Sequence, residues 1–271
     1  MPKIDFYLSK PVVNAAGFLG FFPDVRSPID FSRLGAFITN PVSLKPRTPA
    51  RGTRFLTFRG GFLLHTGYPN PGLNQVIRHH AVHWAGSSLP VIVHILAENA
   101  DEVLECTKRL EVIGGVAGIE LGIADDADPQ MTWSMIQAAI GELPVIVRLP
   151  MNHAVELAKK IAHLATAEFV TKNRMEQEDT NPALSGIVAF SLGPTRGVLP
   201  DANGGLQQGR LYGPAFYPLA LQTILSLVKV GIPVIGAGGI YTPGDVDAML
   251  FAGAIAVQLD AVLWGIQTLK G

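Results

Sequence analysis

Two segments near the C-terminal end carry most of the information about the fold: IPVIGAGGI at residues 232–240 and FAGAIAVQL at residues 251–259. Each is an apolar run broken by glycine, and about ten residues of helical pattern separate them. Buried parallel strands read as nearly continuous apolar runs, so each segment predicts a strand of a parallel sheet. A strand, a short helix and a second strand form the βα unit from which α/β folds are built.

The same alternation extends over the whole chain. Strand candidates lie at residues 11–16, 36–39, 90–96, 118–123, 144–149, 186–190, 233–236 and 254–259. Helical patterns lie at residues 74–84, 101–113, 129–140, 153–167, 218–230 and 243–251. About eight strand–helix pairs in one domain, residues 1–271, predict a (β/α)₈ TIM barrel. A doubly wound open sheet is the alternative that periodicity alone leaves open.

Two insertions interrupt this rhythm. Residues 41–67 follow the second strand and read as a loop with a hairpin, and the glycine-rich residues 193–214 follow the sixth strand. Both come after the carboxyl ends of strands, the face on which barrel enzymes build their active sites. We therefore expect the functional site beside these two inserted loops.

Composition excludes several classes of function. The chain has 271 residues, a net charge of -1, 48% hydrophobic and 16% charged residues, so it is not a disordered protein. It lacks the basic surplus that nucleic-acid binding requires. No uncharged apolar run reaches about 18 residues, so no membrane contact is expected. Cys106 is the single cysteine, which excludes an intrachain disulfide and fits a reducing, cytoplasmic location.

Glycines after the seventh strand predict a phosphate site. Gly236, Gly238 and Gly239 would let the backbone approach a ligand at the start of the next helix. Barrel enzymes place phosphate after their last two strands, and a matching step at Gly253 precedes the eighth strand. The alternative is a turn in which glycine serves packing alone.

Polar residues inside apolar strands are the second signal, because unpaired polar groups are costly to bury. His94, Glu120 and Arg148 are the three clearest cases. Arg148 is predicted to hold an anionic ligand, and an ion pair with Glu120 across the barrel is the alternative. His94 lacks metal-ligand spacing, so no metal site is expected. Asp125 follows the fourth strand and is a candidate base, although acids there also serve as turn and cap residues.

Several short motifs follow one another over nearly the whole length of the chain. They are NAAG at 14–17, GAFIT at 35–39, PR at 46–47, GYPNPG at 67–72, PVIVH at 90–94, PVIVRLP at 144–150, GGL at 204–206, PLAL at 218–221, and the two closing strands. In this order they resemble one family: the dihydroorotate dehydrogenases, flavin mononucleotide (FMN) barrels, and especially the soluble class.

The resemblance implies a small-molecule substrate, bound FMN and a homodimer. In the family, a loop Cys or Ser removes a proton from the substrate and a hydride passes to the flavin; Asp125 stands at that loop position. The implied cofactor-binding residues are Ala16, Gly17, Asn40, His94, Arg148, Ser191, Gly236, Gly238 and Gly239.

Most positions that would hold orotate differ from the family pattern. Asn40 replaces the lysine after strand two, Leu64 replaces an asparagine before the GYPNPG segment at 67–72, and His94 replaces another asparagine. Arg148 replaces a lysine and keeps its charge. Asp260 stands where the family has glycine beside the phosphate, and an acid there is unfavourable for a bound anion.

We therefore expect an FMN-dependent oxidoreductase that acts on a small molecule other than dihydroorotate. The alternative is a catalytically inactive relative that serves as a binding or subunit-interface protein. A phosphate-ester enzyme that uses the same turn without flavin is a third hypothesis.

Overall fold

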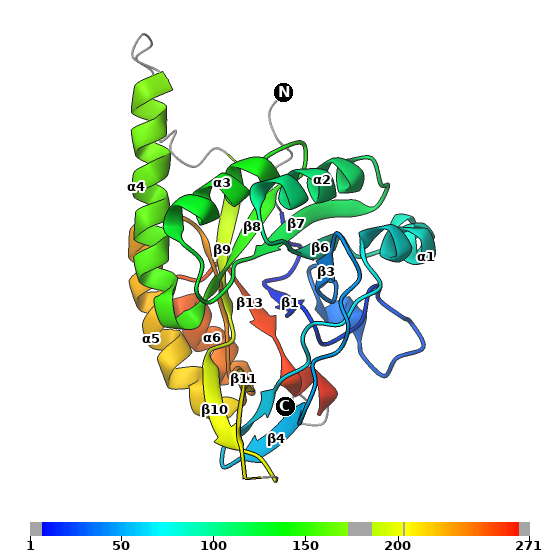
Figure 1. The fold of residues 1–271 in the computed structure, drawn as a ribbon, viewed down its shortest axis with the longest axis vertical. Coiled ribbons are helices and arrows are strands. Elements are labelled where there is room, and N and C mark those ends of the chain that lie inside the picture. Colours follow the sequence, from blue (N-terminus) through cyan, green and yellow to red (C-terminus); the bar gives the residue numbers. More distant parts are fainter. Residues whose placement is uncertain (1–6, 173–185, 203, 266–271) are drawn as a thin grey trace.

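A barrel of eight parallel strands forms the centre of the computed structural model, which describes residues 7–172, 186–202 and 204–265 (Figure 1). The neighbours follow the order β1-β13-β12-β9-β8-β7-β6-β2, and a short strand β3 (Val42–Ser43) also pairs with β6. The predicted barrel and all eight strand positions are confirmed. The barrel strands are β1 (Val12–Asn14), β2 (Phe37–Ile38), β6 (Val91–Leu96), β7 (Val116–Gly122), β8 (Val145–Pro150), β9 (Ile187–Gly193), β12 (Val234–Ala237) and β13 (Ala256–Leu259).

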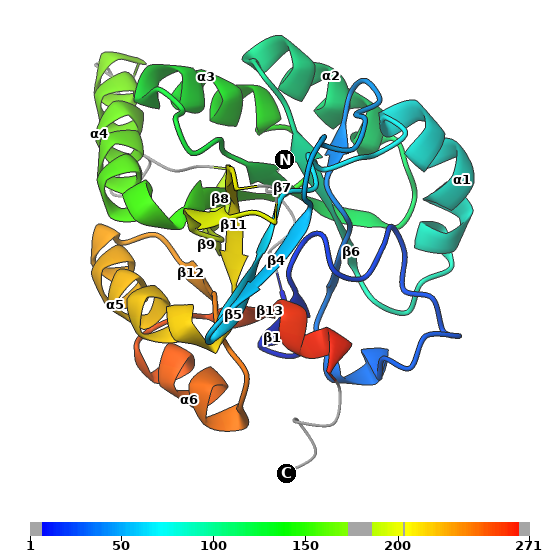
Figure 2. The same ribbon diagram turned by 60° about the horizontal axis from the view of Figure 1, so that its bottom comes forward.

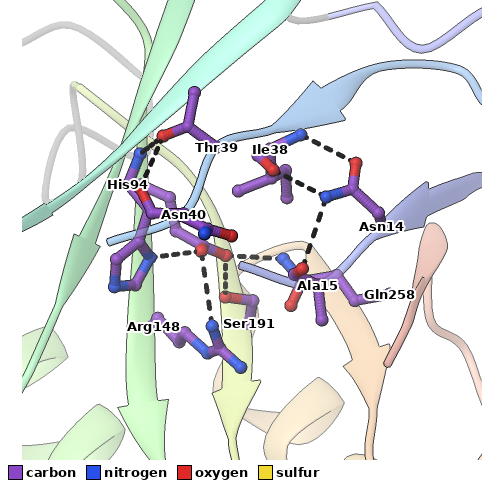
Figure 3. A network of polar contacts seen from close by, with 10 residues as sticks. Asn14, Ala15, Ile38, Thr39, Asn40, His94, Arg148, Ser191 and Gln258 are labelled. Carbon is purple, nitrogen blue, oxygen red and sulfur yellow. Dashed lines mark hydrogen bonds and ion pairs between the residues drawn. The ribbon is translucent and has the colours of Figure 1, made fainter. Parts of the chain in front are cut away.

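A side chain joins β1 to β2 where the barrel closes. The buried amide of Asn14 donates to the carbonyl of Ile38 (2.6 Å) and accepts from its N–H (2.9 Å), as Figure 3 shows. The Gly35 N–H donates to the Val12 carbonyl (2.8 Å). Buried backbone groups need partners, and the Asn14 amide supplies both for Ile38 in place of a strand ladder.

Helices surround the barrel (Figures 1 and 2). The predicted helical segments are confirmed as α1 (Leu73–Ala85), α2 (Ala100–Glu111), α3 (Pro129–Ala139), α4 (Ala154–Lys172), α5 (Tyr217–Leu227) and α6 (Pro243–Phe251). The first and last units carry short 3₁₀ turns instead, η1 (Phe31–Arg33) and η6 (Ala261–Trp264). Prolines at 23 and 28 explain why the first unit has no long helix, because proline breaks a helix interior. No helix in the described part of the chain is long and apolar enough to cross a membrane.

The two insertions form a second sheet together. Its antiparallel strands are β4 (Phe55–Phe58), β5 (Gly61–Leu64), β10 (Arg196–Pro200) and β11 (Leu206–Tyr212), in the order β10-β11-β5-β4. Leu64 pairs with Arg210, so the two insertions meet at the β5–β11 edge. Figure 2 shows this sheet crossing one end of the barrel. The sequence predicted the first hairpin but neither the strands of the second insertion nor the pairing between them.

The core has an outer and an inner layer. The outer cluster joins strand residues such as Val93 and Val147 to helix residues such as Leu110 and Ile161. The inner cluster contains residues from strands and the segments beside them, with no helix residue, and includes Ile92, Ile146 and Ile235. Because side chains alternate along a strand, this inner cluster fills the barrel interior.

Candidate functional site

A carboxylate stands at the centre of a polar cluster inside the barrel. Glu120 on β7 is fully buried. Its oxygens accept hydrogen bonds from side chains on three other barrel strands: from His94 Nδ1 (2.6 Å, β6), Ser191 Oγ (2.8 Å, β9) and Gln258 Nε2 (2.5 Å, β13). Arg148 Nη1 on β8 lies 3.8 Å from Glu120 Oε2. Figure 3 shows these partners converging from different strands.

Strand register brings the cluster together. His94 is paired with Glu120 between β6 and β7, and Arg148 with Ser191 between β8 and β9. In each strand the neighbouring apolar residues point the other way, toward the helices, because side chains alternate. The ion pair between Arg148 and Glu120, one of the two alternatives drawn from the sequence, is therefore present.

The charges in this cluster balance. Burial raises the pKa of Glu120, but the hydrogen bond from His94 and the charge of Arg148 outweigh it and hold the pKa at about 2. Burial lowers the pKa of His94, and the hydrogen bond to Glu120 offsets this only in part. Near neutral pH, Glu120 is an anion, Arg148 a cation, and His94 neutral with its Nδ1–H donating to Glu120. A neutral His94 leaves Nε2 as an acceptor.

A cavity of about 530 Å³ opens beside this cluster. His94 and Arg148 form part of its wall, and Arg47, Tyr68, Arg210 and Asp125 form other parts. The Arg210 guanidinium lies 3.7 Å above the centre of the Tyr68 ring, a cation–π contact that holds it in place. Asp125 lies 3.2 Å from Arg196.

Arg148 has one nitrogen without a partner. Its side chain is 7% exposed, and its Nε is buried and makes no hydrogen bond in the structure. Arg148 also borders a second, much smaller cavity, at the turn that follows β12. Arg148 therefore lies between the large cavity and the small one.

The small cavity lies at the turn of Gly238 and Gly239 after β12, called the glycine turn below. Asp260 contributes a buried carboxylate to this cavity. Asp260 Oδ1 accepts from the N–H of Ala261 (2.5 Å), and the backbone N–H groups of Gly239 and Asp260 also donate to this carboxylate. Burial raises the pKa of Asp260 from 3.8 to about 6, against the opposing effect of those hydrogen bonds. Asp260 thus caps η6 and ties it to the end of β12.

The space at this turn does not fit the FMN that the resemblance implies. The cavity measures about 10 Å³, and Met151, Tyr212 and Phe216 line it. One water requires roughly 10–15 Å³. A Cβ on Gly238 would lie 2.8 Å from the Met151 methyl, so that methyl already fills the notch that this glycine leaves. Neither a phosphate nor a ring system has room there.

The structure separates the predicted site residues. His94, Arg148 and Ser191 meet at Glu120, Asp125 lies across the large cavity, and Gly238 and Gly239 border the small one. Four others line neither cavity: Ala16, Gly17, Asn40 and Gly236.

Two of these four have structural contacts of their own. Asn40 Oδ1 accepts from the Gly20 N–H (3.1 Å), and a Cβ on Gly236 would lie 3.2 Å from Met249 Sδ. The cofactor-binding and catalytic roles assigned to all of these residues stay predictions.

Sequence reasoning missed several residues. The sequence identifies Glu120 as a polar residue inside a strand and as an ion-pair partner of Arg148, but not as the centre of the cluster. Gln258 is polar within the apolar run AIAVQL, so the rule that found His94 would also have found it. Arg210 lies in the second insertion and Tyr68 directly follows the first, where no apolar pattern marks a polar side chain as unusual.

Three comparisons with known proteins agree. A family model described as dihydroorotate dehydrogenase matches residues 3–267. The catalytic subunits of dihydroorotate dehydrogenase B (NAD(+)) from Geobacter sulfurreducens and Geobacter metallireducens are each 30% identical over 265 residues, covering 93% of this chain and 83% of the relative. A crystal structure of DHODH in complex with ferulenol, from Eimeria tenella, has the same fold (TM-score 0.71, 16% identity, 94% of this chain and 76% of that chain). The chain belongs to the dihydroorotate dehydrogenase family.

Proposed function

We propose that this chain binds a small organic anion in the large cavity at the barrel mouth and acts as a binding protein of the dihydroorotate dehydrogenase fold. The observation that carries this proposal is the buried Nε of Arg148, which has no hydrogen-bond partner. A buried donor without a partner costs about 1–3 kcal/mol, and a bound acceptor would remove that cost.

Three arginines, Arg47, Arg148 and Arg210, form the cationic part of a cavity wall that also carries Glu98, Asp125 and Asp126. Within the described residues, neither Arg47 nor Arg210 has a carboxylate oxygen within 4.0 Å, whereas Asp125 on the same wall is paired with Arg196. A guanidinium offers a planar fork of donors that matches a carboxylate. Arg210 is already oriented by its contact with Tyr68, so less side-chain freedom is lost on binding.

The size and the apolar part of the wall support an organic ligand. A volume of about 530 Å³ lies within the range of known small-molecule sites, roughly 300–1,000 Å³. Leu96, Ile123, Met131 and Met135 supply the apolar surface. A small carboxylate with a flat apolar body fits both parts of this wall.

Isothermal titration calorimetry tests the proposal with three probes: orotate, dihydroorotate and benzoate. We expect saturable binding of at least one carboxylate to the wild-type protein and roughly tenfold weaker binding to Arg210→Gln, which corresponds to about 1.4 kcal/mol. Arg78→Gln, on the exposed face of α1, removes the same charge and should leave the affinity unchanged. Equal affinity of the Arg210→Gln and wild-type proteins would refute this use of the cavity.

A flavin-dependent oxidoreductase is the second candidate, because enzymes of this family are flavin-dependent and the similar Geobacter proteins are named catalytic subunits. On that reading the chain would carry FMN, act on dihydroorotate or another small molecule, and work with a partner subunit. Yellow purified protein that is bleached by its substrate would favour this candidate. Colourless protein that FMN does not tint would exclude it.

A further inference from the structure

We propose that Asp260 is a built-in replacement for a cofactor phosphate: its carboxylate occupies the backbone donors at the glycine turn, so that no flavin phosphate binds there. The inference concerns the small cavity and is independent of the ligand of the large one.

The position of Asp260 supports this role. It directly follows β13 and precedes η6, while Gly239 follows β12. The N–H groups of Gly239 and Ala261 therefore come from two neighbouring βα turns, and both donate to one carboxylate. Backbone N–H groups at such turns are the donors that anionic phosphates use. Here these N–H groups donate to the Asp260 carboxylate, an anion that the chain itself supplies.

Charge and packing act in the same direction. A phosphate at this turn would lie against a carboxylate that is 7% exposed, and like charges in a poorly solvated site repel strongly. The Met151 methyl fills the notch at Gly238, and Tyr212 and Phe216 close the remaining space. The two glycines are explained by packing, since a Cβ on Gly239 would lie 2.5 Å from the Tyr217 nitrogen.

The N-terminus of the neighbouring helix α6 is also capped by side chains of the chain itself. Thr242 Oγ1 accepts from the Asp245 N–H (3.2 Å), and Asp245 Oδ2 accepts from the N–H groups of Tyr241 (2.9 Å) and Thr242 (2.8 Å). This capping box uses the first donors of α6 internally. Both helical starts beside the glycine turn are therefore capped by side chains of the chain itself.

The wild-type protein provides the first test, by NMR of the backbone amides. We expect the Gly239 and Ala261 amide shifts to follow a single titration, that of the Asp260 carboxyl, and to stay unchanged when FMN is added. Amides that do not follow this titration, or that shift on addition of FMN, would overturn the proposal.

A variant that reopens the turn provides the second test. Asp260→Gly combined with Met151→Ala frees the donors and the space, so inorganic phosphate should raise the melting temperature of this variant and leave that of the wild type unchanged. Asp247→Asn with Leu104→Ala, at two exposed positions that line neither cavity, is the matched control. A variant that is folded by circular dichroism but whose melting temperature does not change with phosphate would contradict the proposal. If the variant does not fold, the amide titration of the wild-type protein decides.

Discussion

The two sides of the barrel mouth each contain a buried carboxylate, but in opposite states. Glu120 has charged and neutral side-chain partners and a pKa of about 2, whereas Asp260 relies mainly on backbone N–H groups and has a pKa of about 6. The side of Glu120 keeps a cavity of about 530 Å³, and the side of Asp260 keeps about 10 Å³. Arg148 beside Glu120 retains one donor without a hydrogen-bond partner, its Nε, whereas the backbone donors at Asp260 are used by the carboxylate.

The largest expected effect comes from removing the charge of Glu120. Glu120→Gln leaves the Arg148 guanidinium buried without its counterion, so we expect a loss of about 3–5 kcal/mol in the free energy of unfolding, measured with urea. Glu156→Gln breaks an exposed pair with Lys160 and should leave the free energy of unfolding nearly unchanged. Comparable losses in the two variants would mean that Glu120 is not the centre of its cluster.

An intermediate effect is expected from Asp260, and it depends on pH. Because its pKa is raised from 3.8 to about 6 on folding, the folded state holds a proton that the unfolded state has lost, and stability falls as pH rises through this interval. The fall amounts to about 3 kcal/mol for a shift of about two units.

Asp260→Asn isolates this contribution. The difference in unfolding free energy between wild type and variant should shift in favour of Asp260→Asn from pH 4 to pH 7, since other groups such as His94 contribute equally to both proteins. For Glu120 the sign is reversed: its lowered pKa stabilises the protein above pH 4.5, and acid removes this stabilisation toward pH 2. A difference curve that stays flat from pH 4 to pH 7 would contradict the buried state of Asp260.

The smallest effect is expected at the rim of the large cavity. Arg196 and Asp125 lie 3.2 Å apart with side-chain exposures of 44% and 27%, so solvent screens their interaction. Arg196→Gln should change the unfolding free energy by less than about 1 kcal/mol. A larger loss, measured by the same urea titration, would show that the rim supports the barrel as strongly as the buried cluster does.

Local patterns predicted the strands and helices, although periodicity alone left an open sheet as the alternative to the barrel. Apolar runs such as residues 90–96 and 144–149 are typical of buried parallel strands, and Asn99 and Asp128 cap α2 and α3, in line with the capping preference of Asn and Asp. The pairing of β5 with β11 was not predictable, because it joins segments far apart in sequence and neither segment has a pattern that specifies its partner.

The site was predictable only in part. The cost of burying polar groups identified His94 and Arg148, and strand register then placed them together. The glycines were ambiguous, because Gly238 and Gly239 serve close packing as readily as phosphate binding. Asp260 was recognised as unfavourable beside a phosphate, but its contact with the Gly239 N–H depends on how two separate turns approach each other.

The sheet made by the two insertions also bears on how the protein is assembled. The hairpin of β4 and β5 leaves the ribosome long before β11, so its pairing edge has to wait for most of the barrel to be synthesised. This second sheet is therefore completed late, and a nascent chain carries an unpaired strand edge until β11 has been synthesised. We expect truncated or stalled chains of this protein to aggregate through that edge.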